Sequence, residues 1–86
     1  MKVNIIEIEG NVLVDLLKER QRQNRLHPYE LDLPFMFTVL SEEVGEVAEA
    51  LQAHYKIPGV KDTDKDNLYQ ELIEVAAVAV RMAERL

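Results

Sequence analysis

Residues 34–55 read PFMFTVLSEEVGEVAEALQAHY, and this stretch decides the fold. Hydrophobic residues recur in it at the spacing of a helix with one buried face, and they are Met36, Leu40, Val44, Val47 and Leu51. Asp32 and Pro34 suit the beginning of such a helix. Pro58 and Gly59 suit its end. The sequence therefore predicts a helix from about Pro34 to Tyr55.

Two further helices are predicted, one before and one after this stretch. The first begins at Asn4 or Gly10 and ends near Arg25, and its polar part over residues 18–25 is expected to be largely solvated. Residues 3–8 fit either an extended arm or an extra helical turn. The last helix runs from about Asp66 to the C-terminus, with Asn67 and Gln70 spaced as a capping box. Its hydrophobic stripe consists of Leu68, Leu72, Val75, Ala79, Met82 and Leu86.

Length and composition predict one all-α domain over residues 1–86. We expect the two later helices to form an antiparallel hairpin, with the first helix packed against it. The chain has no cysteine, so it has neither disulfides nor thiolate zinc sites. A single core of this size is marginal, and both stripes are long and apolar. We therefore expect a second copy of the chain to complete a four-helix-type bundle.

Charge and hydropathy exclude several classes of partner. The net charge of −6 disfavours nucleic acid, because binding to its backbone relies on Lys and Arg. No apolar run approaches the roughly 20 residues of a membrane span, and the N-terminus lacks the features of a signal peptide, so we expect a cytoplasmic protein. His27 and His54 are not spaced as zinc ligands. Residues 62–67 begin like a calcium-binding loop but lack its later ligands, because Ile73 stands where Glu is needed.

Paired glutamates flank the hydrophobic stripes of both long helices. Glu43 and Glu46 are three residues apart, as are Glu71 and Glu74, so each pair lies on one side of its helix. If the helices pack antiparallel through their stripes, four carboxylates converge at the rim of the groove between them. Such carboxylates repel one another and raise each other's pKa. Because Mg²⁺ prefers hard oxygen ligands, the pattern predicts a Mg²⁺ site. Gly45, inside this motif, indicates either close helix packing or approach of a substrate.

These motifs resemble the MazG-like nucleotide pyrophosphohydrolases, an all-α family. Residues 42–46 read EEVGE, and Glu71 and Glu74 follow after 24 intervening residues, which is similar to the family's pattern of acidic residues. The resemblance covers about Pro34 to the end, and it departs from the family at Glu74, where most members have Asp. It implies Glu43, Glu46, Glu71 and Glu74 as metal ligands. It implies Glu42 as an outer-shell group or as the residue that orients or deprotonates the attacking water.

The resemblance also implies an activity. It is the Mg²⁺-dependent hydrolysis of a nucleoside triphosphate between the α and β phosphates, giving nucleoside monophosphate and pyrophosphate, by a homodimer or homotetramer. Phosphoribosyl-ATP pyrophosphohydrolases are relatives, but the Ser-Tyr-Thr segment of that branch is missing here. The alternative is a catalytically weak or inactive helical oligomerisation or regulatory module, which Glu in place of Asp at position 74 favours. Glu43→Gln separates the two, since it abolishes turnover only in the enzyme.

Overall fold

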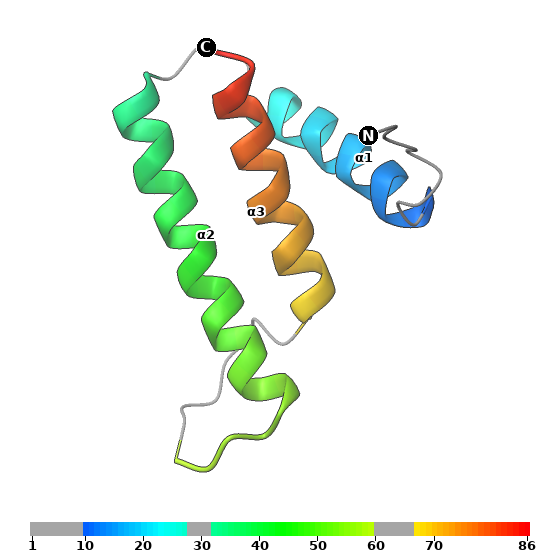
Figure 1. The fold of residues 1–86 in the computed structure, drawn as a ribbon, viewed down its shortest axis with the longest axis vertical. Coiled ribbons are helices and arrows are strands. Elements are labelled where there is room, and N and C mark those ends of the chain that lie inside the picture. Colours follow the sequence, from blue (N-terminus) through cyan, green and yellow to red (C-terminus); the bar gives the residue numbers. More distant parts are fainter. Residues whose placement is uncertain (1–9, 28–31, 60–66) are drawn as a thin grey trace, which may run out of the picture.

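Three helices make up the part of the chain that the computed structural model describes, residues 10–27, 32–59 and 67–86. They are α1 (Gly10–Leu26), α2 (Leu33–His54) and α3 (Leu68–Ala83). α2 and α3 lie side by side and antiparallel, and α1 packs against α3 (Figure 1). The expected all-α hairpin with an added N-terminal helix is therefore confirmed. The predictions for residues 3–8 and for the acidic part of the loop at 62–66 lie outside the described residues.

Local interactions fix where the helices begin and end. Asp32 Oδ1 accepts a hydrogen bond from the backbone N–H of Phe35 at 2.8 Å, and Asn67 Oδ1 accepts one from Gln70 at 3.1 Å. These side chains satisfy amide groups that have no partner within the helix. The capping box at α3 is only half formed, because the Gln70 side chain donates to Glu74 Oε1 instead. α2 ends at His54, before Lys56 and Gly59 adopt positive φ angles of 52° and 82°.

The hydrophobic core is small. Its buried apolar residues come from the two helices of the hairpin, and they are Met36 and Ala50 on α2 and Ile73, Ala77 and Val78 on α3. Because two of the five are alanines, the packed volume is modest. We infer that close approach of α2 and α3, with burial of polar groups beside them, holds the fold together.

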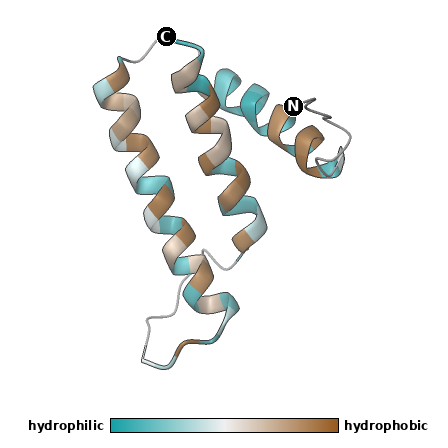
Figure 2. Ribbon diagram, viewed as in Figure 1, coloured by the Kyte–Doolittle hydropathy of each residue, from teal (hydrophilic) through white to brown (hydrophobic). Residues whose placement is uncertain are grey.

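Two of the five residues in the first predicted hydrophobic stripe and three of the six in the second lie on the surface, which corrects the expectation that the stripes pack against each other. Val44, Leu51 and Leu72 are 43–51% exposed. Ala79 is exposed as well, and Leu86 is 95% exposed. The reason is that, among the described helices, α3 packs against α1 and α2 only, so its third side meets none of them. Figure 2 shows hydrophobic segments spaced along both helices of the hairpin.

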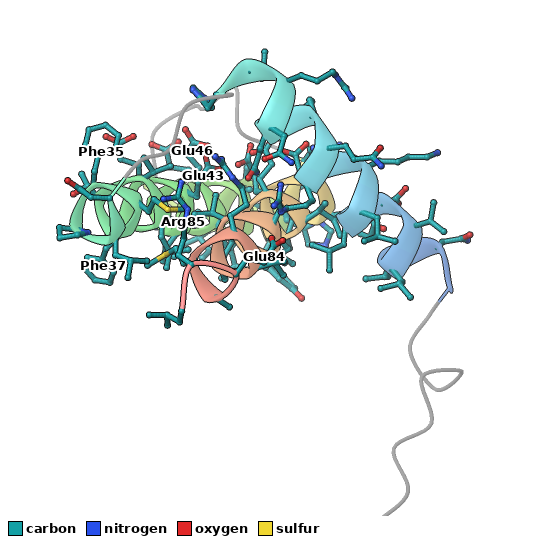
Figure 3. All side chains as sticks on the ribbon, turned by 90° about the horizontal axis from the view of Figure 1, so that it is seen from above. Phe35, Phe37, Glu43, Glu46, Glu84 and Arg85 are labelled. Atoms are coloured by element: carbon teal, nitrogen blue, oxygen red, sulfur yellow. The ribbon has the colours of Figure 1, made fainter. Side chains whose placement is uncertain are left out.

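Six of the exposed apolar residues fall into two rows with a spacing of seven. The row on α2 consists of Phe37, Val44 and Leu51. The second row consists of Leu72 and Ala79 on α3 and of Leu86, which follows the end of that helix. We call these six residues the uncovered face. Figure 3 shows Phe37 on the opposite side of α2 from Glu43 and Glu46. At about 100° per residue, the α3 row likewise lies away from Glu74.

Candidate metal centre

Four glutamates from the two antiparallel helices come together on the other side of the hairpin. Each of them offers one carboxylate oxygen, and these four oxygens all lie within 4.8 Å of one another. They are Glu43 and Glu46 of α2 and Glu71 and Glu74 of α3. The expected convergence therefore occurs, but the cluster lies deeper than a groove rim, because Glu71 is only 6% exposed.

Burial makes this cluster electrostatically demanding. Burial, then repulsion from Glu46 and Glu74, raises the pKa of Glu43 to about 7. Burial, then its interactions with Glu74 and Glu46, raises the pKa of Glu71 to about 7. The Oε2 atoms of Glu43 and Glu71 are buried and have no hydrogen-bond partner. Because an unpaired buried oxygen is unfavourable, the cluster is suited to taking up protons or a cation.

The polar C-terminal part of α1 packs beside the cluster and contacts Glu74. Glu19 and Gln23 are buried, although the sequence predicted a solvated tail. Arg22 makes a bidentate ion pair with Glu19, with Nε–Oε1 and Nη2–Oε2 distances of 2.7 and 2.8 Å. Gln23 Nε2 donates to Glu19 Oε2 at 2.9 Å and to the backbone oxygen of Glu74 at 3.4 Å. Although burial opposes ionisation of Glu19, the hydrogen bonds from Arg22 and Gln23 lower its pKa.

This polar packing was missed, but the sequence holds a signal for it. Val12, Leu16, Glu19 and Gln23 follow one another at intervals of four, three and four. This is the spacing of one helix face, so the two polar residues continue the buried side of α1.

Glu74 has two polar neighbours outside the cluster, Arg22 and Gln70. Its Oε1 lies 3.7 Å from Arg22 Nη2 and accepts a hydrogen bond from Gln70 Nε2 at 3.3 Å. At this position most members of the MazG-like family have the shorter Asp. The longer side chain of Glu74 is thus held between α1 and the preceding turn of α3.

A mainly apolar cavity adjoins the Glu43 edge of the cluster. Its volume is about 380 Å³, within the range of small-ligand sites. Its walls are His27, Phe35, Met36, Val39, Glu42, Glu43, Val78 and Arg81. Glu42 is exposed and is not among the four converging carboxylates. It lies instead on the cavity wall next to Glu43.

Gly45 does not mark a close contact within this chain. A Cβ placed there would meet nothing within 4 Å, and the residue is exposed. Close packing between helices of one chain is therefore excluded as the reason for a glycine at this position.

The histidines take no part in a metal cluster. Among the described residues, the one group of three or more acids, histidines or cysteines with converging ligand atoms is the four-glutamate set. The His54 ring instead packs edge-on against Tyr55, with their centroids 4.9 Å apart.

Comparison of the chain with protein-family models, with curated proteins and with solved structures finds no match. No helix in the described part of the chain has the length and hydrophobicity to cross a membrane.

Proposed function

We propose that the protein is a Mg²⁺-dependent nucleoside triphosphate pyrophosphohydrolase, which yields nucleoside monophosphate and pyrophosphate. The observation that carries the proposal is the set of four carboxylate oxygens within 4.8 Å of one another. The donor set fits the ion, since Mg²⁺ takes oxygen ligands and leaves places for water and phosphate. The two buried oxygens without partners, on Glu43 and Glu71, point the same way.

Each part of the site has a role in this reaction. Glu43, Glu46, Glu71 and Glu74 would hold the cation, which would neutralise phosphate charge when bound. The oxygen of water forms a bond to the α phosphorus, and the bond from that phosphorus to the bridging oxygen breaks. The bridging oxygen leaves with pyrophosphate, and the carboxylate of Glu42 accepts the proton of the water. The cavity beside Glu43 offers room for the part of the nucleotide that does not react.

We also propose that two copies of the chain pair through the uncovered face. Rows of apolar residues at a spacing of seven are typical of helices that pack at a shallow angle in bundles. Two hairpins joined there would form a four-helix bundle. Leu72→Glu should reduce the mass in solution from that of a dimer to that of a monomer, measured by light scattering after gel filtration. Leu17→Glu, an exposed leucine on α1, is the matched control.

One observation favours the alternative, an inactive helical module. Glu74 lies beside Arg22 and accepts a hydrogen bond from Gln70, so one carboxylate of the cluster already has a cationic neighbour. If that arrangement replaces the metal, Mg²⁺ adds nothing to the fold.

The deciding experiment incubates the protein with a panel of nucleoside triphosphates and Mg²⁺ and measures release of monophosphate and pyrophosphate. We expect release that requires Mg²⁺ and falls at least a hundredfold in Glu43→Gln, because a ligand is lost. Glu49→Gln, an exposed glutamate on the same helix, is the control and should keep the activity. A folded protein that binds no Mg²⁺ and releases no pyrophosphate would favour the module.

A further inference from the structure

A second hollow, of about 330 Å³, lies between α1 and α3. The described residues that line it are Asp15, Lys18, Glu19, Arg22, Arg25 and Gln70. Lys18, Arg22 and Arg25 follow one another at intervals of four and three, so they share one side of α1. We call this hollow the cationic groove. Three cations and two acids therefore line a hollow of a chain whose net charge is −6.

The acids of the cationic groove already have partners. Asp15 Oδ2 accepts a hydrogen bond from the Tyr69 hydroxyl at 2.6 Å. Glu19 is held by Arg22 and Gln23. Within the described residues, no carboxylate forms an ion pair with Lys18 or Arg25. Two of the three cations therefore remain available to an anion from outside the chain.

The cationic groove begins at the edge of the carboxylate cluster. Arg22 reaches to 3.7 Å from Glu74, and Gln70, which lines the groove, donates to the same carboxylate. The mainly apolar cavity begins at Glu43, which belongs to the other helix of the hairpin. The cluster thus has an apolar cavity on one side and a cationic groove on the other.

We propose that the cationic groove binds the pyrophosphate end of the nucleotide, the β and γ phosphates that leave together. This inference rests on the proposed function and adds a direction to it, because it assigns the charged end of the substrate to α1. Arginine and lysine are the side chains that recognise phosphate best. Negative charge grows on the leaving pyrophosphate during the reaction, so cations there stabilise the transition state.

The opposite direction would use Arg81, which lines the cavity and lies close to Arg20 and Arg85. The residues that line the two hollows decide between the two directions of the nucleotide. Arg81 shares its cavity with Phe35, Val39 and Val78, whereas the described residues that line the groove are polar or charged. A pyrophosphate group, which carries several negative charges, is better matched by the three cations of the groove than by the one arginine of the cavity.

The test measures binding and needs no turnover. Inorganic pyrophosphate, and separately the monophosphates of the common nucleosides, are titrated into the protein with Mg²⁺ in a calorimeter. Lys18→Gln and Arg25→Gln each remove one charge from the groove. Lys56→Gln removes one from the exposed turn after α2 and is the control. Arg81→Gln tests the opposite direction.

We expect Lys18→Gln and Arg25→Gln each to weaken pyrophosphate binding about threefold or more. Binding of monophosphate should change less than twofold, and Lys56→Gln should change neither. The proposal is overturned if the groove variants bind pyrophosphate as the parent does, if they lose monophosphate equally, or if Arg81→Gln alone weakens pyrophosphate. It is overturned as well if the parent binds no pyrophosphate. Titration with Mg²⁺ alone separates these results from failure of the proposed function, because that function fails if the cluster binds no metal.

Discussion

The two sides of the α2–α3 hairpin have opposite characters. The side with the cluster contains buried carboxylates, and α1 adds the buried Glu19 and Gln23 next to it. The other side presents Leu72 and Val44 to the surface. In a typical domain the inner side is apolar and the outer side polar. Here Glu71, Glu19 and Gln23 are buried, whereas apolar residues of the uncovered face lie at the surface.

The largest difference in the free energy of unfolding is expected between variants of two neighbouring residues of α3, one in the core and one on the uncovered face. Ile73 is 5% exposed and Leu72 is 49% exposed. Ile73→Ala should lower the free energy of unfolding by about 2–5 kcal/mol, because it leaves a cavity in a small core. Leu72→Ala should change it by less than about 0.5 kcal/mol at concentrations where the chain is monomeric. Urea denaturation monitored by circular dichroism measures both.

Repeating the denaturation at high protein concentration sharpens this comparison. If the uncovered face is an interface, the parent gains stability with concentration and Leu72→Ala gains less. Equal losses for both variants at low concentration would contradict the difference in character between the two sides.

The next largest effect concerns the polar packing of α1. Glu19→Ala removes the partner of Arg22 and of the buried Gln23. We expect a loss of about 1–3 kcal/mol in the free energy of unfolding, because the remaining buried polar groups lose hydrogen bonds. Asn24→Ala, at an exposed position of the same helix, is the control and should change it by less than about 0.5 kcal/mol. A stability equal to that of the parent in Glu19→Ala would mean that the end of α1 is solvated, as the sequence predicted.

The contrast between the two sides also explains what the sequence could predict. Helical spacing identified the three helices and put Met36 correctly in the core. It could not say that Leu51 and Leu72 face outward, because spacing shows which residues share a face and not which face has a neighbour. Glu19 and Gln23 were missed because residue type outweighed their position. Their spacing from Leu16 was the better guide.

A smaller effect is expected from pH. In the folded chain the pKa values of Glu43 and Glu71 are about 7, above the unfolded value of 4.5. Between these values the folded chain binds protons that the unfolded chain has released, so stability falls as pH rises from about 5 to 8. Without divalent cations, the melting temperature should fall by about 5 °C or more over this range. Scanning calorimetry in matched buffers containing a chelator measures it.

Two controls connect this result with the cluster. In Glu43→Gln the fall should be smaller, because one of the two groups no longer titrates and repulsion is relieved. With Mg²⁺ present the direction should reverse, since ionised carboxylates bind the cation and protonated ones do not. A parent protein whose stability rises with pH in chelator would show that Glu43 and Glu71 are ionised without a metal.

The sequence predicted which four glutamates meet, but it did not predict how deeply they are buried or which residues of α1 lie beside them. The spacing of Glu43 with Glu46, and of Glu71 with Glu74, was enough to predict that the four would meet. The burial of Glu71 and the approach of Arg22 to Glu74 depend on how α1 crosses α3, which no spacing within one helix determines. For the same reason the groove beside Glu74 could not be predicted.

The smallest effect is a gain in stability at Gly45. The position is exposed in the middle of α2, and an added Cβ would meet nothing within 4 Å. Gly45→Ala should therefore raise the free energy of unfolding by about 0.5–1 kcal/mol, because glycine loses more backbone entropy in a helix. Urea denaturation of the parent and the variant at low concentration measures it. A loss of stability that appears only at high concentration would mean that a second copy packs closely at Gly45, and the interface would then extend beyond the uncovered face.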